Sequence, residues 1–237
     1  MKLLPLVKTQ GNRFYQLDWI IQSFPNDYEK LDYIEPYAGG ASVLLNKPAS
    51  QFEALNEIDL GIIQIYRAMR DEPGLFIGRI KRIKYCETTF QRADRRDQQP
   101  KEFEDYMDHA VNEFILRRMS VSGNREVFGG SEKTWTRVVA ELRATAKRLS
   151  NIHIFNKNAR QIIQAFNQES TFLYLDPPFL EESDESTNYH VELAELLGAF
   201  LGRAMIMGKP CALYRRLYQT WKCVKNTDNT DALWVNY

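Results

Sequence analysis

The stretch "YIEPYAGGASVLL", residues 33–45, has the pattern of a strand that ends in a tight turn and continues as a helix. Glu35 closes the apolar run, and Gly39 and Gly40 allow the backbone to turn sharply and to approach a ligand closely. Neither the dinucleotide fingerprint nor a P-loop is present. An acid before the glycines suits a ligand with a positive group, and an ordinary strand-to-helix turn is the alternative.

On both sides of this stretch, strand-like runs alternate with helical periodicity. Strands are predicted at 31–37, 52–57, 151–155, 171–175, 203–208 and 232–237. Helices are predicted at 12–24, 59–70, 134–149, 159–167 and 191–201. This alternation predicts an α/β fold with a mostly parallel sheet. Residues 222–237 read as two strands around a polar turn, so the sheet is expected to finish antiparallel.

The middle of the chain, residues 73–149, shows no convincing strand and is predicted to be an inserted helical subdomain. Residues 79–148 contain 16 Lys and Arg and 11 Asp and Glu, a local excess of about five positive charges. Such an excess fits either solvated helix faces or a surface that contacts phosphates. The acidic stretch 180–189 is expected to be a mobile loop.

Bulk properties exclude several classes of protein. The 237 residues are 44% hydrophobic with a net charge of zero, so a sizeable core is expected. We expect no membrane span, because no run of about 18 apolar residues exists, and no signal peptide, because the first apolar stretch is too short. The three cysteines form no C-x-x-C pair, which argues against a zinc site or disulfides and for a reducing cytoplasm.

A second candidate segment is "FEALNEIDL", residues 52–60. Glu57 stands at the end of the strand, about 20 residues after the glycine turn, where an acid can accept both hydroxyls of a ribose. Asp59 is predicted to be the N-cap of the next helix. Glu53 is expected to face solvent.

The third segment is "YLDPPF", residues 174–179. Asp176 and the Pro177 carbonyl offer two acceptors for the hydrogens of an exocyclic amine, and Phe179 offers a ring that can stack on the base. A tight turn is the alternative, but it explains the Asp and the Phe poorly. Because parallel sheets bind ligands beyond the carboxyl ends of their strands, Glu35, Glu57 and Asp176 are expected to converge on one crevice.

Taken in order, these segments resemble the Dam-type DNA N6-adenine methyltransferases over essentially the whole chain. Within this family, the chain resembles the phage and prophage branch most. The resemblance includes "PLVKTQGNRFYQLDWIIQSFP" at the N-terminus and "DALWVNY" at the C-terminus. Gly11-Asn12-Arg13 stands where the family usually has Gly-Gly-Lys, and Phe179 where Tyr is commoner. Asn158 stands where the family often has an acid.

The resemblance implies a Rossmann-like, S-adenosyl-L-methionine-dependent methyltransferase sheet with an inserted helical DNA-recognition subdomain. Residues 1–72 and 150–237 would form the cofactor-binding catalytic domain, and 73–149 the target-recognition insertion. The methyl group would pass to an adenine flipped out of double-stranded DNA, without a metal.

The resemblance also assigns residues to three roles. The implied catalytic residues are Asp176, Pro177, Pro178 and Phe179. The implied cofactor-binding residues are Lys8, Gly11, Arg13, Glu35, Pro36, Tyr37, Gly39, Gly40, Glu57, Asn158 and Asp176. The candidates for binding DNA are Arg118, Ser122, Asn124, Arg125 and Lys133, of which the basic ones suit phosphates and Asn and Arg suit base edges.

Other functions are open at this stage. A DNA-binding relative that keeps the fold but has weak or no catalysis is the main alternative. A methyltransferase for RNA or protein amides is less favoured, because related motifs for other nitrogens carry Asn in place of Asp176. A nicotinamide oxidoreductase lacks its fingerprint. We further expect a monomer or weak dimer in a bacterial or phage-infected cytoplasm, with a place in restriction–modification.

Overall fold

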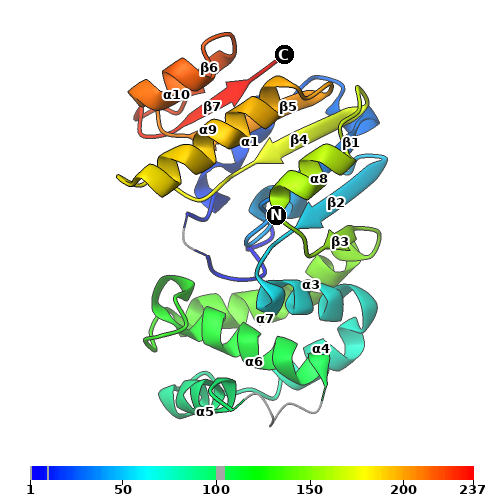
Figure 1. Ribbon diagram of the computed structural model, residues 1–237. Helices are drawn as coiled ribbons and strands as arrows, with labels where there is room; N and C mark the ends of the chain where they lie inside the picture. Colours follow the sequence, from blue (N-terminus) through cyan, green and yellow to red (C-terminus); the bar gives the residue numbers. More distant parts are fainter. Residues whose placement is uncertain (1, 10, 100–104) are drawn as a thin grey trace. The chain divides into compact units, whose positions relative to one another are not determined.

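The computed structural model describes residues 2–9, 11–99 and 105–237 (Figure 1). The chain forms two compact units. The helical unit comprises residues 1–17, 39–46 and 59–156, and the sheet unit comprises 18–38, 47–58 and 157–237. These boundaries differ from the predicted ones at 72/73 and 149/150, because helix α3 (Leu60–Asp71) packs against the inserted helices α6 (Tyr106–Met119) and α7 (Glu132–Leu149).

The sheet unit contains six of the seven strands of one sheet, in the order β2-β1-β4-β5-β7-β6. Their bounds are β1 Asp32–Glu35, β2 Phe52–Asn56, β4 Thr171–Leu175, β5 Arg203–Gly208, β6 Lys222–Lys225 and β7 Ala232–Val235. Strands β2, β1, β4 and β5 are parallel neighbours, whereas β7 is antiparallel to β5 and to β6. The predicted mostly parallel sheet with an antiparallel finish is confirmed.

The helices of the sheet unit cover a core built on fully buried strands such as β4. They are α1 (Leu17–Gln22, whose first residue falls in the helical unit), α8 (Ala159–Ala165), α9 (Asp184–Gly198) and α10 (Ala212–Leu217). Helices α8 and α9 lie side by side (Figure 1). The core aromatic residues Phe24, Tyr33 and Phe172 pack with ring centroids 4.8–5.8 Å apart.

Helix α9 begins seven residues earlier than the periodicity of 191–201 predicts. Ser183 caps it, and its Oγ accepts a hydrogen bond of 3.1 Å from the Ser186 N–H. The expectation of a mobile loop over 180–189 was therefore wrong from Asp184 onward. The acidic residues there stabilise the first turn of a helix, where negative charge is favourable.

The helical unit is built around α6, most of whose side chains are buried. Its other elements are α2 (Ser42–Asn46), α3, α4 (Pro73–Ile80), α5 (Glu87–Asp97), α7 and the short strand β3 (His153–Phe155). Within the described parts of 73–149, the structure has helices, turns and one isolated bridge between Ser120 and Phe128, but no strand, as predicted. Asp59 caps α3 by accepting from the Ile62 N–H, which also confirms a prediction.

Among the residues that the structure describes, no helix has the length and apolar character needed to cross a bilayer.

Candidate active site

Three acids stand at or just after the carboxyl ends of three neighbouring parallel strands. In the register of the sheet, Glu35 pairs with Leu55, two residues before Glu57. Ile34 pairs with Leu173, three residues before Asp176. Since the strands run in one direction, Glu35, Glu57 and Asp176 stand at the same edge of the sheet, the edge at which α/β proteins bind ligands.

Asn56 holds the segments at this edge together. Its Nδ2 donates to the carbonyls of Pro36 and Lys157, both at 2.9 Å, and its Oδ1 accepts from the Lys157 N–H at 2.9 Å. Its own carbonyl accepts from the Ala38 N–H at 2.9 Å. The side chain is 1% exposed, so these bonds fix the turn after β1 relative to β2.

Glu35 stands at this edge, but its side chain is buried. Only 2% of the residue is exposed, and its Oε1 accepts a hydrogen bond of 2.6 Å from the Tyr33 hydroxyl. The Lys47 ammonium lies 4.1 Å from the centre of the Tyr33 ring and forms an ion pair with Glu53. The Glu35 carboxylate is therefore held inside the sheet unit by Tyr33 of its own strand. The expectation that Glu53 faces solvent was wrong, because its buried carboxylate neutralises Lys47.

Tyr37 and Glu57 are both half-buried. The Tyr37 hydroxyl lies 2.6 Å from the Tyr189 hydroxyl, and burial followed by the nearness of Tyr189 raises the pKa of Tyr37. Glu57 Oε1 accepts from the Ile58 N–H at 2.9 Å. Asn158 is exposed and caps α8 by accepting from the Arg160 N–H at 2.9 Å. Pro36, between Glu35 and Tyr37, is buried.

The Asp-Pro-Pro-Phe segment directly follows the fully buried strand β4. Asp176 is half-buried, Pro177 is buried and Pro178 is exposed. Phe179 is 41% exposed, although a large apolar ring normally gains free energy by burial. An acid, two rigid residues and a partly exposed ring thus stand in sequence at the ligand-binding edge.

The two glycines of the turn are required by its geometry. Gly39 has φ +48°, and its carbonyl accepts a hydrogen bond of 2.6 Å from the Tyr66 hydroxyl. A Cβ at Gly40 would lie 2.8 Å from the Val7 carbonyl oxygen. The short helix α2 follows directly after these glycines.

The N-terminal candidates belong to the helical unit. The Lys8 ammonium donates to the Ser120 carbonyl at 3.0 Å, and burial followed by the charge of Arg118 lowers its pKa. Gly11 has φ +78°, a conformation that suits glycine. Arg13 is 9% exposed and donates to Gln16 Oε1 at 3.3 Å. Lys8 is therefore tied to the end of α6.

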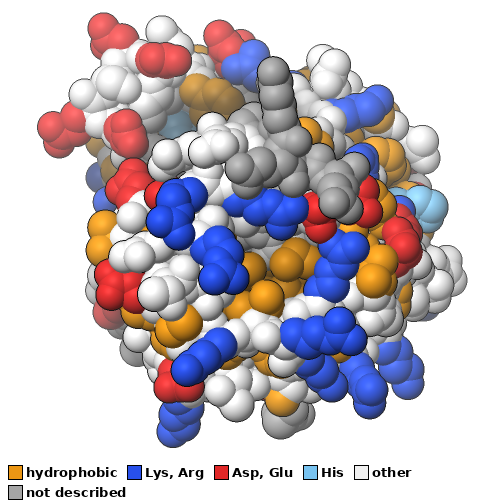
Figure 2. Space-filling view, turned by 90° about the horizontal axis from the view of Figure 1, so that it is seen from below, with side chains coloured by type: hydrophobic (Ala, Val, Ile, Leu, Met, Phe, Trp, Pro, Cys, Tyr) orange, Lys and Arg blue, Asp and Glu red, His pale blue; other side chains and the backbone are white. Residues whose placement is uncertain are grey.

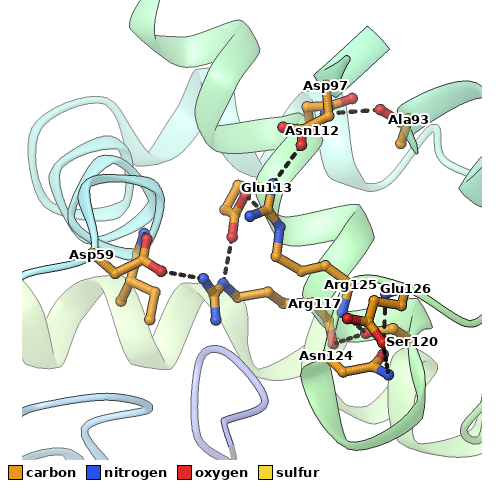
Figure 3. Close-up of polar contacts among 11 residues, drawn as sticks. Asp59, Ala93, Asp97, Asn112, Glu113, Arg117, Ser120, Asn124, Arg125 and Glu126 are labelled. Atoms are coloured by element: carbon orange, nitrogen blue, oxygen red, sulfur yellow. Dashed lines mark hydrogen bonds and ion pairs between the residues drawn. The ribbon is translucent and has the colours of Figure 1, made fainter. Parts of the chain in front are cut away.

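A polar network organises the segment after α6 (Figure 3). Glu113 forms ion pairs with Arg117 and Arg125, and Arg117 also pairs with Asp59. Arg125 has φ +67° and forms a further ion pair of 2.6 Å with Asp97. Burial raises the pKa of Glu113, and the two arginines oppose this shift. The guanidinium of Arg125 therefore fixes this segment.

The five predicted DNA-binding residues separate into two groups. Arg118 is 3% exposed and donates to the Pro5 carbonyl at 3.4 Å, and burial lowers its pKa to about 10. It is unsuited to contact a phosphate at the surface, so that expectation is corrected. Ser122, Asn124 and Lys133 are exposed, and Arg125 is partly exposed.

The helical unit carries many other exposed cations. Figure 2 shows one face of the molecule on which Lys and Arg side chains gather, with hydrophobic side chains between them. Exposed basic residues of the unit are Lys2, Lys81, Arg82, Lys84, Arg92, Arg95, Lys133, Arg137, Arg143 and Lys147. Periodicity and charge counts indicated a basic helical region, but not which cations reach solvent.

Residues 10–195 match the family model of the D12 class N6 adenine-specific DNA methyltransferases. The chain belongs to this family. It is also 27% identical over 186 residues to the Type II methyltransferase M.CviBI of Paramecium bursaria Chlorella virus NC1A, a match that covers 74% of this chain and 68% of the relative. The predicted activity, N6-methylation of adenine in DNA, is confirmed. The assignment to the Dam-type group and to its phage branch stays a prediction.

Proposed function

We propose that the protein takes its methyl group from S-adenosyl-L-methionine and transfers it to the N6 atom of an adenine flipped out of duplex DNA. The observation that carries this proposal is the Asp-Pro-Pro-Phe segment after β4, with Asp176 half-buried and Phe179 partly exposed at the ligand-binding edge. The membership of the D12 class supports it.

The groups at the strand ends fit this methyl donor chemically. Glu57 is a half-buried carboxylate after β2, which suits the two hydroxyls of a ribose. Asn56 keeps the Pro36–Ala38 turn in place. S-Adenosyl-L-methionine, when bound, supplies a methyl group already activated by a sulfonium. The roles of Lys8, Gly11 and Arg13 toward its methionine carboxylate stay predictions.

The chain's own contribution to the reaction is position and charge. The Asp176 carboxylate and the Pro177 carbonyl accept the two hydrogens of the adenine N6 amine, which aims the nitrogen lone pair. The negative charge of Asp176 stabilises the positive charge that grows on N6. The Phe179 ring stacks on the base and holds it outside the duplex.

The exposed cations of the helical unit are proposed to contact DNA phosphates, and Asn124 to reach a base edge. Arg125 is assigned to fixing the recognition segment, because its guanidinium forms ion pairs with Asp97 and Glu113. A place in restriction–modification stays a prediction.

The test is transfer of a labelled methyl group to duplex DNA, followed by long-read sequencing of DNA from cells that express the chain. N6-methyladenine in a fixed sequence context is the expected result. Calorimetry of methyl-donor binding, read together with the transfer assay, separates this function from the inactive alternative, because an inactive relative would either fail to bind the donor or bind it without turnover.

A further inference from the structure

Two consecutive residues of α9, Tyr189 and His190, approach two different motif segments of the sheet unit. Successive residues of an α-helix point about 100° apart, so neighbours in the chain contact different surroundings. Tyr189 reaches Tyr37 in the turn after β1, with the two hydroxyl oxygens 2.6 Å apart. His190 reaches the backbone of Pro178 in the segment after β4.

His190 is held firmly in the interior. It is 1% exposed, and its Nδ1 lies 3.1 Å from the hydroxyl of Tyr214 in α10. Tyr214 is itself 2% exposed and is seated on Gly208, where an added Cβ would lie 2.1 Å from the tyrosine ring. The orientation of the imidazole is therefore set by packing on two sides.

The contact with Pro178 has a defined chemical direction. Proline has no backbone N–H, so only its carbonyl oxygen is available, and the histidine must donate. Burial lowers the pKa of His190, which favours the neutral ring, and the Pro178 backbone opposes this shift. When the Tyr214 hydroxyl donates to Nδ1, the ring hydrogen stands on Nε2.

Within the described residues, the buried Nε2 of His190 has no hydrogen-bond partner, and the Pro178 backbone is the polar group that affects the imidazole from this side. Bonds that position catalytic groups often become regular only when the substrates are bound. A buried donor of this kind is costly unless it acquires its acceptor.

The Tyr189 ring is fixed from its other side. The Arg160 guanidinium lies 5.7 Å from the centre of the ring, a cation–π contact. Arg160 also forms an ion pair with Glu192, three residues further along α9. The tyrosine hydroxyl is thereby directed toward Tyr37.

We propose that Tyr189 and His190 are a positioning pair, which fixes the Tyr37 turn and the Pro178 peptide relative to each other. The Pro178 peptide stands between the Pro177 carbonyl and the Phe179 ring, so holding it sets both groups. This inference rests on the proposed function, in which the first segment serves the methyl donor and the second serves adenine. The pair acts on kcat, because it aligns two bound molecules.

The tyrosine contact is tested by removing hydroxyl groups one at a time. Tyr37→Phe and Tyr189→Phe are each expected to lower kcat roughly two- to tenfold, the fold-change expected for one hydrogen bond. The double variant should be no worse than either single one. Tyr237→Phe is the matched control, since the Tyr237 hydroxyl donates to the Ser23 carbonyl at 2.8 Å, outside both motif segments, and its loss should leave kcat unchanged. Additive losses, or losses as large in the control, would overturn the proposal.

The histidine contact is tested with His190→Leu and His190→Gln, of which only Gln keeps an N–H donor. His190→Leu should lower kcat at least tenfold with the KM of the methyl donor within about twofold, and His190→Gln should recover part of the loss. Equal losses that follow the melting temperature of each variant would show a purely structural role and overturn the proposal.

A separate readout distinguishes this inference from the proposed function. Nitrogen-15 NMR of the folded protein, assigned through the His190 variants, reports the tautomer without any substrate. The Nε2–H form is expected, and the Nδ1–H form would overturn the donor role. Wild-type protein that binds the methyl donor but methylates no DNA would refute the proposed function, whereas the tautomer would still decide the contact.

Discussion

Site residues were predicted from the sequence in both units, but the predicted positions agree with the structure better in the sheet unit than in the helical unit. In the sheet unit, Glu57 and Asp176 were assigned from strand ends, and the register puts both at one edge. In the helical unit, Arg118 and Lys133 were assigned from charge and position, yet Arg118 is 3% exposed and Lys133 is exposed. The presence of a basic residue in the sequence therefore did not predict that its side chain reaches solvent.

The difference follows from geometry. A parallel strand fixes where its last residue lies, because the ladder leaves little freedom in direction or level. A helix distributes consecutive residues around its axis, so the side that reaches solvent depends on what packs against it. Helix α6 is covered on nearly all sides, so its neighbouring Arg117 and Arg118 are both at most 9% exposed.

The largest effect is expected in the sheet unit, from Asp176→Ala. This variant leaves no carboxylate for the N6 amine, and methyl transfer should fall roughly 100-fold or more, as for the loss of one electrostatic group that stabilises a transition state. The measurement is kcat with labelled methyl donor and duplex DNA, and circular dichroism verifies folding.

Asp176→Asn is the matched variant. The Asn oxygen can still accept a hydrogen bond, so some activity should survive, whereas a residue needed only for the turn would tolerate Asn almost fully. Full activity in a folded Asp176→Ala protein would show that Asp176 is not the acceptor for the N6 amine. The sheet unit would then no longer be the unit whose site residues were predicted correctly.

The next largest effect is expected on the free energy of unfolding, from replacing the buried Arg118 of the helical unit. Arg118→Ala removes a long buried side chain from α6 and should lower the free energy of unfolding by about 2–4 kcal/mol, chiefly through the cavity. Arg118→Met fills similar space without a buried charge and should restore most of that loss. Urea denaturation gives both values. A large loss of DNA affinity in a stable Arg118→Met protein would contradict the structural role.

Much of the fold could be predicted from the sequence. The runs at 171–175 and 203–208 are strands with the predicted bounds, because short apolar runs between turn residues leave few alternatives. The start of α9 was missed, because "SDESTNY" is polar and lacks apolar periodicity. A serine cap and early acids form that helix end, and both signals were present in the sequence.

The motif residues of the candidate site were predicted from the sequence, but the contacts that hold these motifs in place were not. Asp176 and Phe179 carry a local pattern that has chemical meaning by itself. The contacts of Asn56 with Lys157 and of Tyr37 with Tyr189 join residues 101 and 152 positions apart. No local pattern encodes such pairs, so they emerged only from the folded chain.

Glu57→Ala is expected to have an intermediate effect. If its carboxylate accepts the ribose hydroxyls, affinity for the methyl donor should weaken by roughly 1–3 kcal/mol, the range for hydrogen bonds to a charged group. Calorimetry without DNA measures this directly. Glu53→Gln provides a contrast, since Glu53 is buried with Lys47 and its loss should lower stability rather than affinity. Unchanged affinity in Glu57→Ala would exclude the ribose assignment.

The smallest effect, on the salt dependence of DNA binding, is expected from replacing an exposed cation. Lys133, which is exposed, is compared with Arg118, which is buried. Each phosphate contact adds about 0.9 to the slope of log affinity against log salt concentration, because it releases condensed counterions. Lys133→Ala should therefore reduce that slope by about one and weaken binding equally on all DNA sequences. Arg118→Met should leave the slope unchanged, although it also removes one positive charge. Fluorescence anisotropy with duplex DNA at several salt concentrations measures both variants. Equal slopes for Lys133→Ala and the wild type would mean that the exposed lysine does not contact phosphate.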